Sequence, residues 1–181
     1  MSRSFPFSSV SACDSEKIVS STSYDCHRKP GKNDGNLCGV FPASNILSLN
    51  VDKWRHRSSN YWVAEDRKAG FIMFLGCRKA VRGVSLRNTQ NAEHQDRSTR
   101  KFRLLGSSTQ NGPWHELLVA NLEDSRQQKP PPVQKLMFAK SSVVSFIKVE
   151  LLEYYGPIGG GLQYFAIEGP ESTTTTSKQQ L

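Results

Sequence analysis

The clearest hydrophobic pattern along the chain is that of β-strands. Phe71–Leu75 is a continuous apolar run, and its length suits a buried strand better than a helix. Thr99–Leu105 alternates between apolar and charged residues, so a strand there places Phe102 and Leu104 on one face. Ile147–Leu151 repeats the same period of two. These three segments predict strands that contribute side chains to a common core.

Four more segments have the length and composition of strands, and no segment has a convincing amphipathic helical pattern. They are Ala80–Arg87, Trp114–Leu122, Val133–Phe138 and Leu162–Ile167. Clusters of Gly, Pro, Ser and Asn separate the strands, as is typical of turns. Short strands at this spacing, without an internal repeat, predict an all-β fold built as an antiparallel sandwich or barrel.

The two ends of the chain differ from this middle section. Residues 1–35 are rich in Ser, Lys and Gly and are expected to form a disordered lead-in. Residues 170–181 are expected to form a Thr-rich disordered tail, which leaves residues 36–169 as the folded domain. The N-terminal stretch lacks the apolar block of a secretory signal, and no apolar run is long enough to cross a membrane. As written, the chain is expected to be intracellular.

Composition places the chain among folded, basic proteins. Hydrophobic residues make up 36% of the 181 residues, which is enough to build a core. Lys and Arg number 24 against 16 Asp and Glu, a net charge of +8. Eight of the basic residues lie between Arg78 and Arg103, against only Glu93 and Asp96. Such a segment either attracts phosphate, sulfate or anionic lipid, or is simply a solvated face of the sheet.

The four cysteines do not have the spacing of a zinc site, because no Cys-x-x-Cys pair is present. Cys26 and Cys38 flank a cluster of turn residues and would be able to form a disulfide if the chain is exported. Cys77 follows the apolar Phe71–Leu75 segment and is expected to be a buried free thiol.

Nine segments, in their order and spacing, give the chain a resemblance to a known family. They are Ala43–Asn45, Trp54, Gly70–Gly76, Val81–Val84, Arg97–Leu104, Gly112–Trp114, Phe146–Val149, Tyr154–Gly156 and Gly159–Phe165. The chain resembles the coagulation factor type C (discoidin) domain of the galactose-binding-like superfamily, from about Asn36 to Gly169. The resemblance implies an eight-stranded antiparallel jelly-roll β-sandwich. It also implies a non-catalytic module that binds sugars, lipid head groups or other proteins through loops at one end.

Many members of this family hold a structural calcium ion, with an Asp-Gly turn after the first strand and a carboxylate near the last. The corresponding stretches here are Ile46–Asn50 and Gln163, which lack those acidic residues. Calcium prefers six to eight oxygen ligands, several of them from carboxylates. No metal ion or other cofactor is therefore expected. If the chain is a fragment of a larger protein, the family analogy places it outside the cell.

Three loops would carry binding in a fold of this kind. They are Val51–Asn60, Asn88–Ser98 and Tyr154–Gly161. A sugar site needs an aromatic face for the apolar side of the ring and a few fixed hydrogen-bonding groups for its hydroxyls. The candidate ligand-binding residues in these loops are Asp52, His56, Asn88, Arg97 and Tyr155.

The resemblance to sugar-binding members favours Asn88 and Arg97 as the residues that fix the hydroxyl groups, with Tyr155 stacking on the ring. Arg is suited to this because its planar guanidinium donates two parallel hydrogen bonds. The alternatives are that Asn88 caps a turn and that Arg97 pairs with Asp96 to brace its loop.

Motifs of common enzymes are absent from the sequence. It contains no Gly-x-Ser-x-Gly, His-Glu-x-x-His or phosphate-binding glycine loop, and its four histidines are scattered. We therefore expect a carbohydrate-recognition module and not an enzyme, with a glycan or glycoconjugate as its partner. The alternatives are an intracellular protein-interaction domain and a domain that adheres to anionic lipid or polyanions. No nucleic acid partner is expected.

Overall fold

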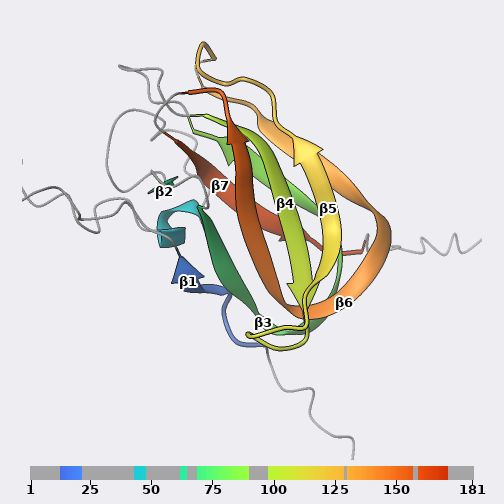
Figure 1. Cartoon of the computed structure of the whole chain (residues 1–181). Helices are drawn as coiled ribbons and strands as arrows, with labels where there is room; N and C mark the ends of the chain where they lie inside the picture. The colour runs from blue at the N-terminus through green and yellow to red at the C-terminus, as the bar shows by residue number, and fades with distance from the viewer. Residues whose placement is uncertain are drawn as a thin grey trace, which may run out of the picture.

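The structure is a computed structural model that describes residues 13–21, 43–47, 62–64, 69–89, 98–128, 130–156 and 159–170. Its strands are β1 (Lys17–Ser21), β2 (Trp62–Ala64), β3 (Gly70–Asn88), β4 (Thr99–Ser107), β5 (His115–Asn121), β6 (Val133–Tyr154) and β7 (Gly160–Glu168) (Figure 1). The 3-10 helix η1 spans Ala43–Leu47. The all-β fold expected from the sequence is confirmed. Within the described ranges, no helix has the length and apolar character needed to cross a membrane.

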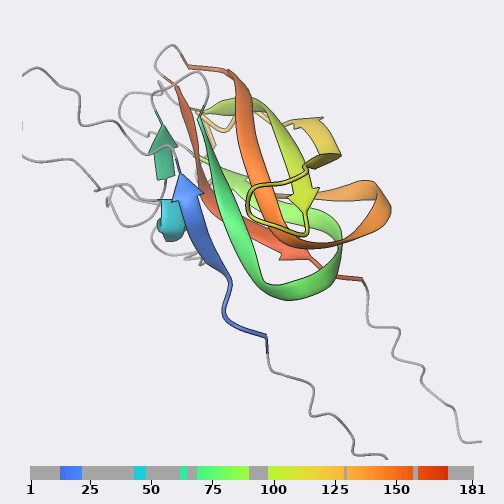
Figure 2. The ribbon, with the colours of Figure 1, turned by 60° about the horizontal axis from the view of Figure 1, so that its bottom comes forward.

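Two long strands, β3 and β6, each take part in both layers of a sandwich. The first half of β3 pairs with β1 and with the second half of β6, which pairs with β4, and β4 pairs with β5. The second half of β3 pairs with the first half of β6 and with β7, which pairs with β2. We call these sets of strands the first layer and the second layer. All pairs are antiparallel, and Figure 2 shows β3 and β6 curving from one layer into the other.

The sequence predicts two short strands where β3 runs and two more where β6 runs. At Gly76 the backbone of β3 has a φ of 82°, in the region that favours glycine, and the pairing register shifts between Phe74 and Lys79. A Cβ atom at Gly76 would lie 1.8 Å from the carbonyl oxygen of Asp14, so a side chain is excluded there. The glycine therefore creates a bulge at which the strand bends, and it does not end the strand.

The core lies between the two layers and follows the predicted alternation. Phe102 and Leu104 of β4 are buried, and so are Ile147, Val149 and Leu151 of β6. Across the sandwich, the rings of Phe71 in the first layer and Phe165 in the second meet edge to face, with their centroids 5.2 Å apart. Edge-to-face contact of this kind stabilises aromatic pairs beyond the area that they bury.

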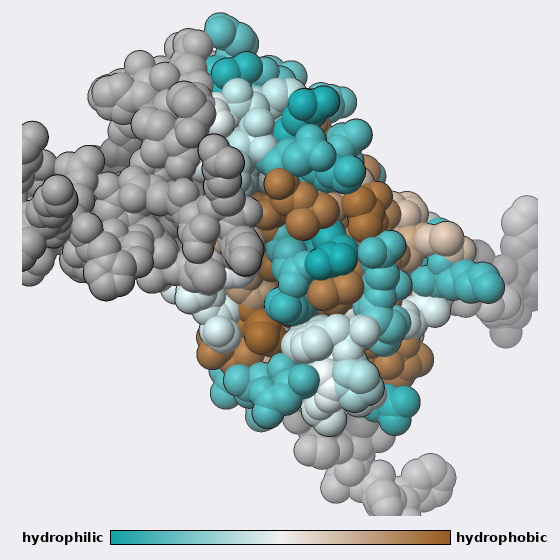
Figure 3. Space-filling model, viewed as in Figure 1, coloured by the Kyte–Doolittle hydropathy of each residue, from teal (hydrophilic) through white to brown (hydrophobic). Residues whose placement is uncertain are grey.

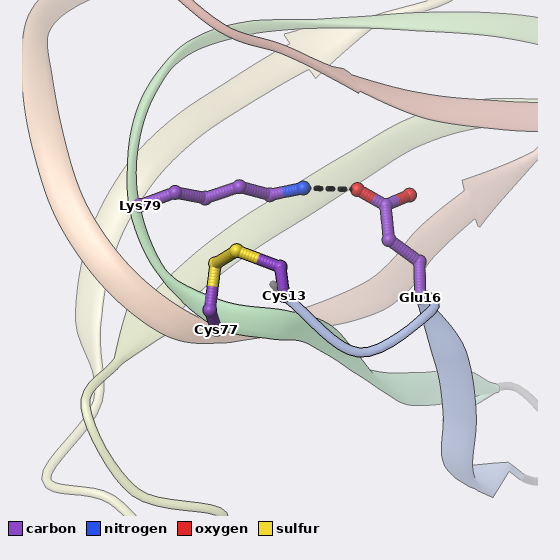
Figure 4. Close-up of a disulfide and its surroundings, with 4 residues drawn as sticks. All are labelled: Cys13, Glu16, Cys77 and Lys79. Carbon is purple, nitrogen blue, oxygen red and sulfur yellow. Dashed lines mark hydrogen bonds and ion pairs between the residues drawn. A yellow bond between two sulfur atoms is a disulfide. The ribbon is translucent and has the colours of Figure 1, made fainter. Parts of the chain in front are cut away.

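The N-terminal segment belongs to the fold, which corrects two expectations from the sequence. Residues 17–21 pair with β3, so the lead-in expected over residues 1–35 does not hold for this part, and the folded unit begins before residue 36. Cys77 is not a free thiol, because it forms a disulfide with Cys13, and the ion pair of Glu16 with Lys79 lies beside it (Figure 4).

The disulfide lies where β3 and β6 pass between the layers, and we call this end of the molecule the bend end. The sequence missed the Cys13–Cys77 pairing because it depends on β1 joining the sheet. Cys26, Cys38 and the Thr-rich stretch 171–181 lie outside the described residues.

Candidate functional site

Five segments that are distant in sequence meet at the end of the sandwich opposite the bend end, at the top of Figure 1. We call this end the rim. It is formed by Asn88 and Thr89 at the end of β3, Ser98 and Thr99 at the start of β4, Leu122–Gln128 after β5, Tyr154–Gly156 at the end of β6, and Gly159–Gly161 at the start of β7. The backbone N–H of Tyr155 donates to the carbonyl of Ser98, at 2.9 Å. The ends of two predicted loops, 88–98 and 154–161, are therefore neighbours at the rim.

Asn88 holds the rim together from the inside. Its side chain is fully buried, and its amide nitrogen donates to the carbonyls of Thr99, at 2.8 Å, and Glu123, at 3.1 Å. Its side-chain oxygen accepts from the backbone N–H groups of Thr89, at 3.0 Å, and Thr99, at 2.9 Å. These four bonds use the full capacity of an Asn side chain. Asn88 is thus a bracing residue that has no hydrogen-bonding group left for a ligand, which corrects its expected role.

Thr99 links the two layers at the rim. Its hydroxyl donates to the carbonyl of Gly161, at 3.0 Å, and accepts from the N–H of the same residue, at 3.2 Å. The neighbouring Gly160 is needed for this approach, because a Cβ atom there would lie 2.5 Å from the ring of Tyr154 and 2.7 Å from the Thr99 hydroxyl. The Gly159–Gly161 stretch is therefore a close-packed contact between strands as well as a turn.

Residues 122–128 are a part of the rim that the sequence analysis missed. The buried hydroxyl of Ser125 donates to the carbonyl of Thr89, at 2.8 Å, and lies 3.2 Å from the hydroxyl of Ser98. The signal that would have found this segment is the pair of turn formers Asp124 and Ser125, which lie two and three residues after the predicted strand Trp114–Leu122.

Two arginines approach the ring of Tyr155 at the rim. Its hydroxyl donates to the carbonyl of Leu122, at 2.9 Å. The guanidinium carbons of Arg126 and Arg100 lie 5.8 Å and 6.0 Å from the centre of its ring, within the range of cation–π attraction. The half-buried ring is therefore fixed in place, and its role in stacking on a sugar stays a prediction.

An ion pair fixes one of these arginines in turn. Arg126 donates from Nε to Oδ1 of Asp124, at 2.9 Å, and from Nη2 to Oδ2, at 2.7 Å. This two-point contact is the geometry that favours arginine–carboxylate pairs. The hydrogen bonds from Arg126 lower the pKa of Asp124, and those to Asp124 raise the pKa of Arg126.

Three of the expected ligand-binding residues, Asp52, His56 and Arg97, lie outside the described residues, as does the loop Val51–Asn60. Their roles stay predictions. Arg97 is the direct neighbour of Ser98, whose buried side chain and carbonyl are both bonded within the rim.

Ion pairs neutralise much of the basic segment between Arg78 and Arg103. Lys79 pairs with Glu16, and Arg103 with Glu150. Arg100 and Lys101 both lie 3.6 Å from carboxylate oxygens of Glu153. Across the outer face of the first layer, hydrophilic and hydrophobic surface alternate (Figure 3), as expected for a solvated sheet face. Adhesion to anionic lipid or polyanions through this segment receives no support.

The outer face of the first layer also carries a groove of about 570 Å³, lined in part by Gly70, Arg103, Lys148 and Glu150. The charges in the groove are paired with one another, because Glu150 accepts hydrogen bonds from Arg103 and lies 2.7 Å from Nζ of Lys148. In the part of the chain that the structure describes, no three His, Cys, Asp or Glu side chains are placed to hold a metal ion.

No protein-family model matches the chain, and no curated protein matches its sequence. Solved structures match its fold. A family 32 carbohydrate-binding module from C. perfringens NanJ, solved in complex with galactose, has a TM-score of 0.58 at 14% identity, over 84% of this chain and 92% of that one. A pectin-binding carbohydrate-binding module has a TM-score of 0.54 at 18% identity, over 89% of this chain and 94% of that one. The chain shares the β-sandwich fold of these modules.

The same fold also occurs as part of an enzyme. Allantoicase matches with a TM-score of 0.57 at 13% identity, over 85% of this chain but only 40% of the allantoicase chain. These similarities confirm the β-sandwich fold that the resemblance to discoidin domains implied.

Proposed function

We propose that the chain is a non-catalytic module that recognises a carbohydrate through the rim, and that it is related to the discoidin domains. The observation that carries this proposal is the extent of the fold match. The NanJ and pectin-binding modules align over more than nine-tenths of their own length and over 84% and 89% of this chain. The similarity is therefore between whole modules, whereas allantoicase matches over 40% of its length.

The rim supports this proposal because it is a rigid base for the loops that leave it. The chain leaves the rim at Thr89 and returns at Ser98, and both of these residues are fully buried and bonded to Ser125. Loops whose ends are fixed lose less conformational entropy when they bind a ligand, so the binding free energy is less reduced by ordering. In this arrangement Asn88 binds the backbone N–H groups of Thr89 and Thr99, which lie on either side of the segment that contains Arg97.

Arg97, Asp52 and His56 remain the residues that we propose contact the sugar, with Tyr155 at the edge of the site. The ring of Tyr155 is held by its bond to Leu122 and by two arginines, so it contributes a fixed aromatic surface. Aromatic side chains combine apolar contact with a polar edge, which suits the two sides of a sugar ring.

A glycan array probed with the full-length, disulfide-bonded chain tests the proposal, and Arg97→Ala is the variant that examines the site. We expect binding to one class of saccharide, and its loss in Arg97→Ala. The matched control is Arg78→Ala, which removes the same charge from an exposed position at the bend end. An array without any bound saccharide, or equal binding by both variants, would contradict the proposal.

We also propose that the protein works in an oxidising compartment. The Cys13–Cys77 disulfide supports this, because such bonds persist outside the reducing cytosol. Mass spectrometry of unreduced peptides from the native source tests it, and finding Cys13 and Cys77 as free thiols would contradict it.

A further inference from the structure

Arg87 is a buried cation that lacks a counter-charge among the residues that the structure describes. Its residue is 6% exposed, although it lies next to Asn88 at the end of β3. Its Nε atom has no hydrogen-bond partner, and none of the ion pairs between described residues includes Arg87. Burial lowers the pKa of Arg87. A charged group that is removed from water without a counter-charge destabilises a folded protein, so such groups are normally paired.

Two further side chains near Arg87 have the same unusual property. The pairing of β3 with β7 places Arg87 opposite Tyr164, and a register shift between Arg87 and Asn88 inserts Gln163 as an extra residue beside Tyr164. In a bulge of this kind, two residues on one strand oppose a single residue on the other. Gln163 is 6% exposed, and both polar atoms of its amide lack partners. The buried hydroxyl of Thr89, two residues after Arg87, also lacks one.

Four unpartnered polar atoms therefore lie on three side chains where β3 ends and β7 begins. Buried polar groups in folded proteins are nearly always satisfied, and a cluster of exceptions indicates a missing partner. Two other arginines do have a carboxylate partner: Arg103 is bonded to Glu150, and Arg126 is bonded to Asp124.

The nearest carboxylate along β7 is not available to Arg87. Glu168, four residues beyond Tyr164, accepts a hydrogen bond from the hydroxyl of Ser85, at 2.5 Å, and lies 3.2 Å from Nζ of Lys135. The positive charge of Arg87 is therefore left for a group from outside the described fold.

We propose that Arg87, together with Gln163 and Thr89, binds the carboxylate of an acidic saccharide, a chain that contains uronic acid. This inference rests on the proposed function and specifies its ligand class. A carboxylate matches the planar fork of a guanidinium in both geometry and charge, and a neutral hydroxyl would leave the buried charge uncompensated. The amide of Gln163 and the hydroxyl of Thr89 provide both donors and acceptors for the hydroxyl groups next to that carboxylate.

Calorimetric titration of the full-length chain with an oligogalacturonate, and with the same oligosaccharide after chemical reduction of its carboxyl groups, tests this proposal. We expect the acidic form to bind about tenfold or more tightly, the range of a charge-assisted contact. The difference is expected to persist at about 0.5 M salt, because a buried contact is screened far less than an exposed one.

Arg87→Met is the decisive variant. It removes the charge and keeps much of the volume, so we expect the preference for the acidic form to disappear while the melting temperature stays the same or rises. Arg78→Met, which removes the same charge from an exposed position of the same strand, is expected to keep the preference. Gln163→Leu is expected to weaken the binding of both forms.

The possible failures are distinguishable from one another. Equal binding of the acidic and reduced forms, together with a positive glycan array, overturns this inference and leaves the proposed function standing. A glycan array on which no saccharide is bound overturns both the proposed function and this inference. A lower melting temperature, or failure to fold, in Arg87→Met shows that Arg87 has a structural partner, which also overturns the inference.

Discussion

Asn88 gives the sharpest test of how the rim is built. Asn88→Ala removes four hydrogen bonds, two donated and two accepted, from a fully buried position. At about 1 kcal/mol net for each bond, the expected loss in the free energy of unfolding is about 4 kcal/mol. Proteins of this size are stable by only about 5–15 kcal/mol, so a loss of this size is a large part of the total.

Urea denaturation followed by circular dichroism measures this loss. Asn88→Asp is a graded variant, because it keeps the acceptor for the N–H groups of Thr89 and Thr99 but presents a second oxygen to the carbonyls of Thr99 and Glu123. Because the second oxygen of the introduced side chain would face carbonyl oxygens, the protonated carboxyl group is favoured over the carboxylate, and the folded state raises the pKa of this side chain. The stability of Asn88→Asp relative to the native chain is therefore expected to fall as the pH rises through that pKa.

The reasoning about Asn88 would be refuted by a loss of less than about 1 kcal/mol in Asn88→Ala, which is the worth of a single bond. A variant that kept its stability but lost affinity for saccharides would show that Asn88 contacts the ligand directly.

Two further predictions concern the disulfide and the ion pair at the rim. The Cys13→Ser, Cys77→Ser double variant opens a loop that spans 64 residues. From the chain entropy of such a loop, we expect the free energy of unfolding to fall by at most about 4 kcal/mol, measured as a shift of the urea midpoint. An unchanged midpoint would contradict the anchoring role of Cys13. The lowered pKa of Asp124 means that its pair with Arg126 stabilises the fold above the ordinary carboxyl pKa and loses this effect as the pH falls through the lowered value. In Arg126→Gln, an NMR titration is expected to show the pKa of Asp124 moving upward, and an unchanged value would refute the assignment.

The fold class could be predicted from the sequence because alternation of apolar and charged residues is a local signal. It correctly placed Phe102 and Leu104 inside. The strands at residues 71–75 and 80–87 were predicted as separate because the apolar run ends at Leu75, whereas in the structure Gly76 forms a bulge within the single strand β3. β1 was missed because its five residues become a strand only through their pairing with β3, which local composition does not encode.

The site was predictable in part for similar reasons. A jelly-roll arrangement brings the ends of the loops 88–98 and 154–161 together, and the structure does so through the bond between Tyr155 and Ser98. The role of Asn88 was not predictable, because the residue type that binds hydroxyl groups also satisfies the backbone of a turn. Only the positions of Thr89, Thr99 and Glu123 distinguish these two uses.

The position of the disulfide determines how this domain would sit within a larger polypeptide. Cys13 is tied to the bend end, and β7 runs from the rim to that same end, where Glu168 pairs with Gly83. The two ends of the described sandwich thus lie on the same side, away from the rim (Figure 2). Any neighbouring domain would be tethered behind the sandwich, which would leave the opposite pole pointing outward to reach a surface-bound polymer.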